Sequence, residues 1–235
     1  MDARVARAAH NNVTWCDLVC RTQAIVTLWR QSCWAALAPS PSFYPDAVTL
    51  REDAGAREVL QLIGARPGAT IKDSFATLEL ASAGFEVLFE AQWLWHAPAD
   101  GAGGSEQAGP LRVLESHQQL TAWLAAAGLR GVLTPAILAA PGVRVLAASQ
   151  GGSVCAGAIL NRSRQHVGIT NAFANERSEL TAEGLWPAIA ARAAQLYPGC
   201  GLLGYERGEH LESALAAAFK PLGPLRVWEA APSRA

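Results

Sequence analysis

Three alternating apolar segments follow one another in the second half of this chain. They are residues 143–148, 154–160 and 166–173, and each is six to eight residues long. Gly151 and Gly152 separate the first two segments, and the polar run 161–164 separates the last two. Short glycine-containing or polar turns between alternating segments predict antiparallel strands joined as a meander. Such a sheet buries at least one face, so helices elsewhere in the chain must cover it.

The segments around this meander supply those helices. Before it, the pattern predicts a strand at 111–114, a helix at 116–127 and a short helix near 136–139. After it, the predicted order is a helix at 181–196, a strand at 201–205, a helix at 210–219 and a strand at 222–228. This order predicts an α+β fold, in which helices flank a mixed, mostly antiparallel sheet that gains a parallel step late in the chain.

A seam divides the chain into two parts. Residues 97–110 are small residues rich in glycine and proline, and they offer nothing to bury. We therefore expect an N-terminal α+β subdomain at 1–96, a linker at 97–110 and a C-terminal domain at 111–235.

The N-terminal part has a simpler predicted order. Asn12 is a candidate helix cap before an apolar stripe that includes Trp15, and Gly64 is a candidate stop for a second helix. The predicted elements are a helix from Asn12 onward, a short strand in 43–50, a helix at 52–63, and a hairpin of strands at 74–80 and 85–95. This order is compatible with a partial second copy of the C-terminal fold and with an unrelated subdomain.

Composition excludes several classes of protein. The 19 Lys and Arg residues oppose 20 Asp and Glu residues without clustering, so we expect no nucleic-acid partner. No apolar stretch approaches the ~20 residues that span a bilayer, and the first residues contain no apolar signal segment, so we expect neither a membrane protein nor a secreted one. Five cysteines, an odd number in a chain of 235 residues, favour a reducing compartment, and we expect the cytoplasm.

Two motifs resemble a cofactor site and a metal site, and we interpret neither as such a site. Residues 199–204 match G-x-G-x-x-G, but a predicted helix precedes the glycines and a strand follows them, which is the reverse of a dinucleotide site. We interpret these glycines as a helix end and a strand start. Cys16 and Cys20 are four residues apart without a second pair, so we expect buried thiols and no metal site.

Two further features concern binding surfaces. Trp15, Asp17 and Arg21 combine a stacking face with both signs of charge, and we consider them candidate substrate-binding residues. The chain also has eight tryptophans. Core packing accounts for most of them, and tryptophan-rich edge strands are compatible with a homodimer.

Several sequence segments resemble those of the GNAT N-acetyltransferase superfamily, in particular those of a bacterial branch of it. In the C-terminal part they are 157–162, 170–174 and 223–228, and in the N-terminal part they are 11–17 and 43–46. The predicted order from residue 111 onward is similar to the GNAT order. The resemblance implies a GNAT-like fold and an acyl-CoA-dependent N-acyltransferase that acts on an amine of a small molecule or protein. Acetyl-CoA or another acyl-CoA would then be the co-substrate.

The resemblance also implies a coenzyme A site. Asn171, Phe173 and Ala174 would line the thioester arm through their strand backbone, and Asn175, Arg177 and Gly184 would lie at the phosphate loop. The superfamily's loop normally reads Arg/Gln-x-x-Gly-x-Gly/Ala, because backbone N–H groups at a helix start bind phosphate oxygens. Here only one glycine remains, and the loop contains three glutamates, at 176, 179 and 183.

The superfamily's usual acid is also missing. Gly208 and Ala214 stand where the family often places an asparagine and a tyrosine. We therefore expect Glu206 to be the base and Tyr205 to be a substitute acid, while a solvent-exposed turn is the alternative interpretation of Glu206. The competing function is a non-catalytic GNAT-like protein with a degraded coenzyme A site, which binds a small ligand or a partner.

Overall fold

The computed structural model describes residues 2–98 and 109–231, so most of the predicted linker at 97–110 lies outside the described residues. The chain forms two compact units. Unit 1 contains Met1–Trp93 and Leu222–Ala235, and unit 2 contains Leu94–Pro221. The last predicted strand therefore belongs with the N-terminal part and not with the meander. The physical reason is its pairing, because residues 226–229 are bonded to residues 70–73.

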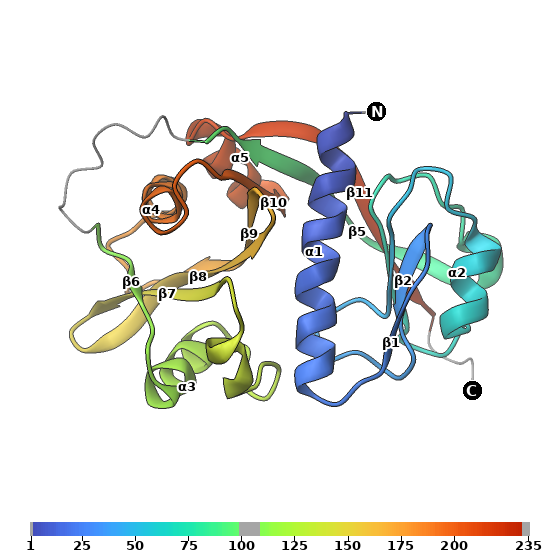
Figure 1. Cartoon of the computed structure of the whole chain (residues 1–235), viewed down its shortest axis with the longest axis horizontal. Helices are drawn as coiled ribbons and strands as arrows, with labels where there is room; N and C mark the ends of the chain where they lie inside the picture. The colour runs from blue at the N-terminus through green and yellow to red at the C-terminus, as the bar shows by residue number, and fades with distance from the viewer. Residues whose placement is uncertain (1, 99–108, 232–235) are drawn as a thin grey trace. The chain divides into compact units, whose positions relative to one another are not determined.

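Unit 1 is a sheet with one helix on each face (Figure 1). Its strand order is β1-β2-β3-β4-β11-β5, and β3 and β4 are parallel. The elements are α1 (Ala3–Thr22), β1 (Thr27–Trp29), β2 (Cys33–Ala36), β3 (Ala47–Thr49), α2 (Ala56–Ile63), β4 (Thr70–Asp73), a 3₁₀ turn (Ala81–Ala83), β5 (Phe85–His96) and β11 (Lys220–Ala230). Both β5 and β11 continue into unit 2.

Helix α1 begins ten residues earlier than predicted. Asp2 is its N-cap, and its carboxylate accepts a hydrogen bond from Arg4 N at 2.8 Å. Asn12 lies inside the helix and is not its cap. The residues before Asn12 are rich in alanine, which favours a helix. The prediction missed this part of the helix because alanine adds little to an apolar stripe. The predicted helix stop at Gly64 is confirmed.

Residues 74–80 are not the predicted strand. The buried Asp73 carboxylate accepts hydrogen bonds from Leu78 N at 2.7 Å and from Phe75 N at 3.3 Å, so the chain turns directly after β4. A side chain that satisfies nearby backbone donors competes with strand pairing. The predicted hairpin is consequently wrong: β4 pairs with β11. Strands β1 and β2 were not predicted at all.

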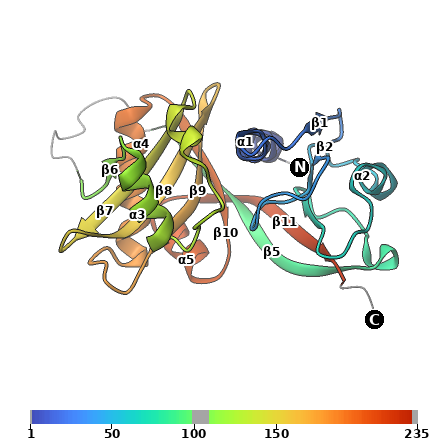
Figure 2. The ribbon, with the colours of Figure 1, turned by 90° about the horizontal axis from the view of Figure 1, so that it is seen from below.

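Unit 2 agrees closely with the predicted order. Its strands follow the order β5-β10-β9-β8-β7-β6. The elements are β6 (Arg112–Val113), α3 (His117–Ala126), a 3₁₀ turn (Pro135–Ala139), β7 (Val143–Gln150), β8 (Ser153–Ser163), β9 (His166–Ala174), α4 (Ala182–Leu196), β10 (Gly201–Glu206) and α5 (Gly208–Ala216). Figure 2 shows α3 and α4 on opposite faces of the β7–β9 meander. The predicted α+β fold, with a mostly antiparallel sheet flanked by helices, is confirmed.

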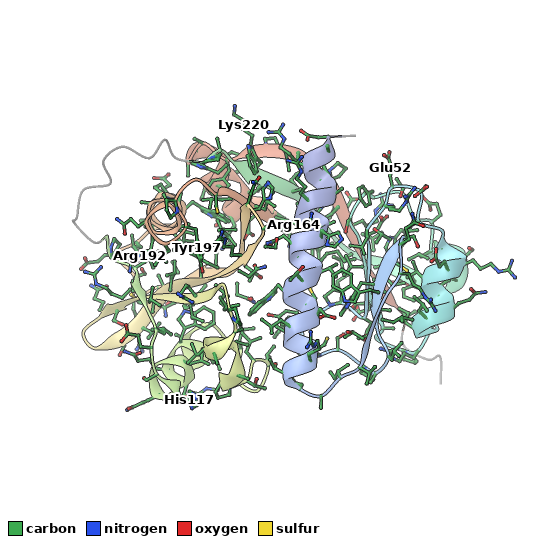
Figure 3. The ribbon with its side chains drawn as sticks, viewed as in Figure 1. Glu52, His117, Arg164, Arg192, Tyr197 and Lys220 are labelled. Carbon is green, nitrogen blue, oxygen red and sulfur yellow. The ribbon has the colours of Figure 1, made fainter. Side chains whose placement is uncertain are left out.

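Two contacts connect the helices of unit 2 to the sheet. The indole N–H of Trp123, from α3, donates to Leu146 O at 2.9 Å. At the end of α4, Tyr197 donates from its hydroxyl to Gly142 O at 2.9 Å (Figure 3). Gly199 follows with φ +74°, and β10 starts at Gly201, so the glycines of 199–204 do end a helix and open a strand.

Candidate functional site

The carboxyl ends of β9 and β10 define the candidate site. These parallel strands pair at Gly201↔His166, Leu202↔Val167 and Leu203↔Gly168, where the paired register ends. Both strands continue beyond it, β9 to Ala174 and β10 to Glu206. We call residues 169–174 and 204–206 the β9–β10 fork. Ligands of open sheets bind beyond the carboxyl ends of parallel strands, so the fork is the natural binding position.

A bulge lies in the β9 side of the fork. Gly157 pairs with Phe173 and Ile159 with Thr170, so β9 contains one residue more than β8 over this stretch. Asn171 has φ +52°, a conformation that asparagine tolerates better than most residues. A bulge re-aims the backbone of its strand and is common beside active sites. The asparagine within an otherwise alternating strand is the signal that could have predicted it.

The side chains next to the bulge anchor β9 to both faces of the sheet. The Phe173 ring meets Trp123 edge-on, with centroids 5.3 Å apart, while Ala172 and Ala174 pack on the core of the opposite face. Asn171, Phe173 and Ala174, the predicted lining of the thioester arm, therefore lie together in the fork. Their binding role stays a prediction.

Glu206 ends β10 on the other side of the fork. It is half-buried. Its loss of hydration raises its pKa to about 8, although the neighbouring Arg207 lowers the pKa in part. A carboxyl group with this pKa exchanges its proton near neutral pH, which suits a general base. Tyr205 precedes it in the same strand, so the two side chains leave β10 toward opposite faces.

The loop between β9 and α4 uses its own backbone donors. Asn175 Oδ1 accepts from Arg177 N at 3.0 Å, and Asn175 O accepts from Ser178 N at 2.9 Å. Ser178 Oγ accepts from Leu180 N at 3.1 Å. The Glu179 carboxylate accepts from Gln150 Nε2 at 2.6 Å. The loop is thus held by internal hydrogen bonds and by one hydrogen bond from β7.

The start of α4 is capped in the same way. Thr181 Oγ1 accepts from Gly184 N at 3.3 Å, and Thr181 O accepts from Gly184 N and Leu185 N, each at 3.0 Å. Glu183 stands in the first turn with an exposed side chain. A carboxylate there interacts favourably with the helix dipole, so the chain supplies an anion of its own at this helix start.

Comparison with solved structures identifies this arrangement. A GCN5-related N-acetyltransferase from Kribbella flavida matches with a TM-score of 0.64 and 12% identity, over 98% of this chain and 96% of that chain. The chain has the GNAT fold. A GCN5-related N-acetyltransferase-like protein from Streptococcus suis matches with a TM-score of 0.51 and 10% identity, over 97% and 99%. The tandem GNAT protein from the clavulanic acid biosynthesis pathway matches with a TM-score of 0.51 and 12% identity, over 86% and 79%.

Sequence comparison adds no closer relative. No protein-family model matches the chain, and a search of curated proteins finds no match. The resemblance to GNAT proteins is therefore confirmed at the level of the fold. The tandem GNAT protein fits the idea that the N-terminal part is a partial second GNAT-like unit, and that idea stays a prediction.

The GNAT fold implies coenzyme A, and the phosphate loop of this chain does not fit it. Among the N–H groups from 175 to 185, those of Arg177, Ser178, Leu180, Gly184 and Leu185 all donate within the loop and the helix start. A Cβ on Gly184 would make only ordinary contacts, at 3.5 Å from Leu180 Cδ2 and 3.9 Å from Thr181 Oγ1, so Gly184 leaves no cradle that a side chain would fill. Across residues 175–184, three carboxylates oppose the single exposed guanidinium of Arg177.

The predicted substrate residues and the fork belong to different units. Trp15, Asp17 and Arg21 lie on α1 in unit 1, whereas Glu206 and the predicted cofactor residues lie in unit 2. Trp15 donates to the Tyr44 hydroxyl at 3.0 Å. Asp17 Oδ1 accepts from Thr27 Oγ1 at 2.5 Å, Trp29 Nε1 at 3.0 Å and Trp34 Nε1 at 2.9 Å. These bonds give Trp15 and Asp17 a role in the fold, and substrate binding by them stays a prediction.

Two further observations concern metals and membranes. In residues 2–98 and 109–231, no group of three or more His, Cys, Asp or Glu side chains is arranged to hold a metal ion. Nor does any helix in that part of the chain have the length and apolarity needed to cross a membrane. All five cysteines are free and buried, as predicted for Cys16 and Cys20. Burial raises the pKa of the Cys16 thiol to about 11.

Proposed function

We propose that this protein is an N-acyltransferase, which moves an acyl group from a thioester to an amine of a small molecule or a protein. Acetyl-CoA and other acyl-CoA thioesters are the first donors to test. The observation that carries the proposal is the fork, where the β9–β10 ladder stops, β9 bulges at Asn171, and Glu206 stands at the opposite strand end with a raised pKa.

Glu206 would provide the proton chemistry. An amine attacks a thioester only as the free base, and most amines are protonated at neutral pH. The ionised Glu206 carboxylate would accept a proton from the attacking ammonium nitrogen, and its high pKa would make it a stronger base than an ordinary glutamate. The lone pair that is freed forms the new C–N bond, the nitrogen then gives its second proton to solvent, and the C–S bond breaks to release a thiolate.

Tyr205 would return a proton to the leaving thiolate. It leaves β10 toward the face opposite to Glu206. Where neighbouring strands are not paired, the space between them opens to both faces of the sheet, so a base on one face and an acid on the other could both reach a thioester held there. The Tyr205→Phe variant should therefore lower kcat.

The proposal is tested by measuring thiol release from acetyl-CoA in the presence of primary amines such as polyamines, aminoglycosides and lysine peptides. Amine-dependent thiol release that Glu206→Gln reduces at least 100-fold supports the proposal. Absence of amine-dependent release with every donor and acceptor contradicts it. The free, buried thiols support a reducing compartment, and we propose that the protein acts in the cytoplasm.

One observation favours a second function. The acidic, internally bonded loop before α4 is what a GNAT-like protein that no longer binds coenzyme A would have. In that case the fork would bind a small ligand or a partner without catalysis. Calorimetry with coenzyme A and with acetyl-CoA distinguishes the two functions when it is read together with the thiol-release assay.

A further inference from the structure

The negative charge of the β9–α4 loop has a direct consequence for the donor. Glu176, Glu179 and Glu183 all have exposed side chains, and Arg177 shows no ion pair within the described part of the chain. A pyrophosphate placed at the start of α4 would meet a net charge of about −2 from residues 175–184. The pyrophosphate and these carboxylates carry like charges and repel each other, and water and salt screen this repulsion only in part.

The backbone can offset this repulsion only in part. Anion sites at helix starts work because several N–H groups point at the ligand. In this chain the Thr181 cap uses Gly184 N–H, and Asn175 and Ser178 accept from the N–H groups of Arg177, Ser178 and Leu180. Glu183 already provides the negative charge that the helix dipole favours. A phosphate bound through these N–H groups would have to break their bonds, and it would lie close to the Glu183 carboxylate.

The fork has none of these obstacles. An acyl-pantetheine arm is uncharged, and it needs only backbone donors and acceptors along β9. The β9–β10 register ends at Gly168, and we assign the arm to the edge of β9 beyond this residue. The two ends of a coenzyme A molecule would therefore meet opposite conditions in this chain: a suitable strand edge for the arm and a repulsive helix start for the nucleotide.

We infer that this protein recognises its donor as an acyl-pantetheine thioester, and that the acidic β9–α4 loop makes the pyrophosphate of coenzyme A a hindrance to binding. This inference rests on the proposed function for its catalytic part. Free acyl-pantetheine, acyl-4′-phosphopantetheine and an acyl carrier protein bearing that group share the chemistry, and the experiment separates them.

The test compares acetyl-CoA, acetyl-pantetheine, acetyl-phosphopantetheine and acetylated acyl carrier protein as donors for the full chain. We expect kcat/KM for acetyl-pantetheine to equal or exceed the value for acetyl-CoA. Raising the ionic strength from about 0.05 to 0.5 M should lower KM for acetyl-CoA and leave KM for acetyl-pantetheine unchanged, because salt screens repulsion between exposed charges. A conventional phosphate site would show the opposite salt effect.

A matched pair of variants assigns the effect to the loop. Glu176→Gln/Glu183→Gln should raise kcat/KM for acetyl-CoA about tenfold and leave acetyl-pantetheine unchanged, since each change removes one repulsive charge. Glu115→Gln/Glu212→Gln removes the same charge from exposed positions outside the loop and should change neither donor. A wild-type preference of more than 30-fold for acetyl-CoA overturns the inference.

Binding measurements keep the two proposals separate. Calorimetry of pantetheine and coenzyme A with the wild-type protein needs no catalysis. Equal or tighter binding of pantetheine without any acyl transfer supports the donor inference and contradicts the acyltransferase proposal. Acyl transfer together with much tighter binding of coenzyme A supports the acyltransferase proposal and contradicts the donor inference. Absence of binding for both ligands at millimolar concentration overturns the inference.

Discussion

The indole of Trp123 lies against the α-carbon of Gly157, where a Cβ atom would overlap its Nε1 and also Leu146 O. The same indole N–H donates to Leu146 O, and its ring meets Phe173 in the fork. One glycine in β8 therefore allows helix α3 to approach the meander closely enough to support β9 beside its bulge.

Gly157→Ala tests this close approach. The added methyl group must displace the indole or the strand, and overpacking of this kind costs about 1–3 kcal/mol. Chemical unfolding of the full chain measures the loss. Gly184→Ala is the matched control, because its Cβ has room within a helix and should be neutral or stabilise by up to about 1 kcal/mol. Equal stabilities for the two variants would mean that α3 does not pack as described.

Asp17→Ala tests the role of the buried carboxylate in unit 1. The change leaves the donors of Thr27, Trp29 and Trp34 without their common acceptor, and we expect a loss of about 2–4 kcal/mol in the free energy of unfolding. Arg21→Ala removes only an exposed partner at 3.7 Å and should cost less than about 0.5 kcal/mol. If Asp17→Ala left stability intact and impaired substrate binding, the earlier prediction of a substrate site would be favoured instead.

Glu206→Gln tests the raised pKa through stability. The pKa is about 8 in the folded protein against an ordinary 4.5, so the unfolded chain releases this proton first as pH rises. The contribution of Glu206 to stability is therefore complete below about pH 4.5 and is lost as pH rises toward 8. Glutamine has no such loss. In thermal unfolding, the variant should match the wild type at pH 5 and exceed it at pH 8.5, and a constant difference across this range would contradict the raised pKa.

The sequence predicted unit 2 far better than unit 1, for physical reasons. The meander has clean alternation and strong turn signals, and α3 begins with a complete capping box at Ser116 and Gln119. In unit 1, the turn after β4 depends on where the Asp73 carboxylate points, and β1 and β2 are only three and four residues long. The periodicity of apolar residues shows neither the direction of the Asp73 side chain nor strands as short as β1 and β2.

The candidate site divides along the same line. The positions of Glu206, Tyr205 and the β9 residues near the ends of their strands could be predicted from the order of the elements, and their roles stay predictions. The burial of Glu206 could not, because it depends on contacts between distant segments. The bulge was not predicted either, and the asparagine at position 171 was the only local signal for it. The division into residues 1–96 and 111–235 places the final strand differently from the observed units, because strand pairing can join residues from opposite ends of a chain.

The most direct test of the central claim is the pH dependence of amine-dependent thiol release, measured from pH 6 to 9.5 for the wild type and for Glu206→Gln. Acetyl-CoA and acetyl-pantetheine serve as donors. We predict that wild-type kcat rises with pH to a plateau with an apparent pKa near 8, as Glu206 ionises, and that Glu206→Gln loses at least 100-fold in kcat together with this transition. An unchanged rate and profile in Glu206→Gln, or no acyl transfer by the wild type at any pH, would contradict the account.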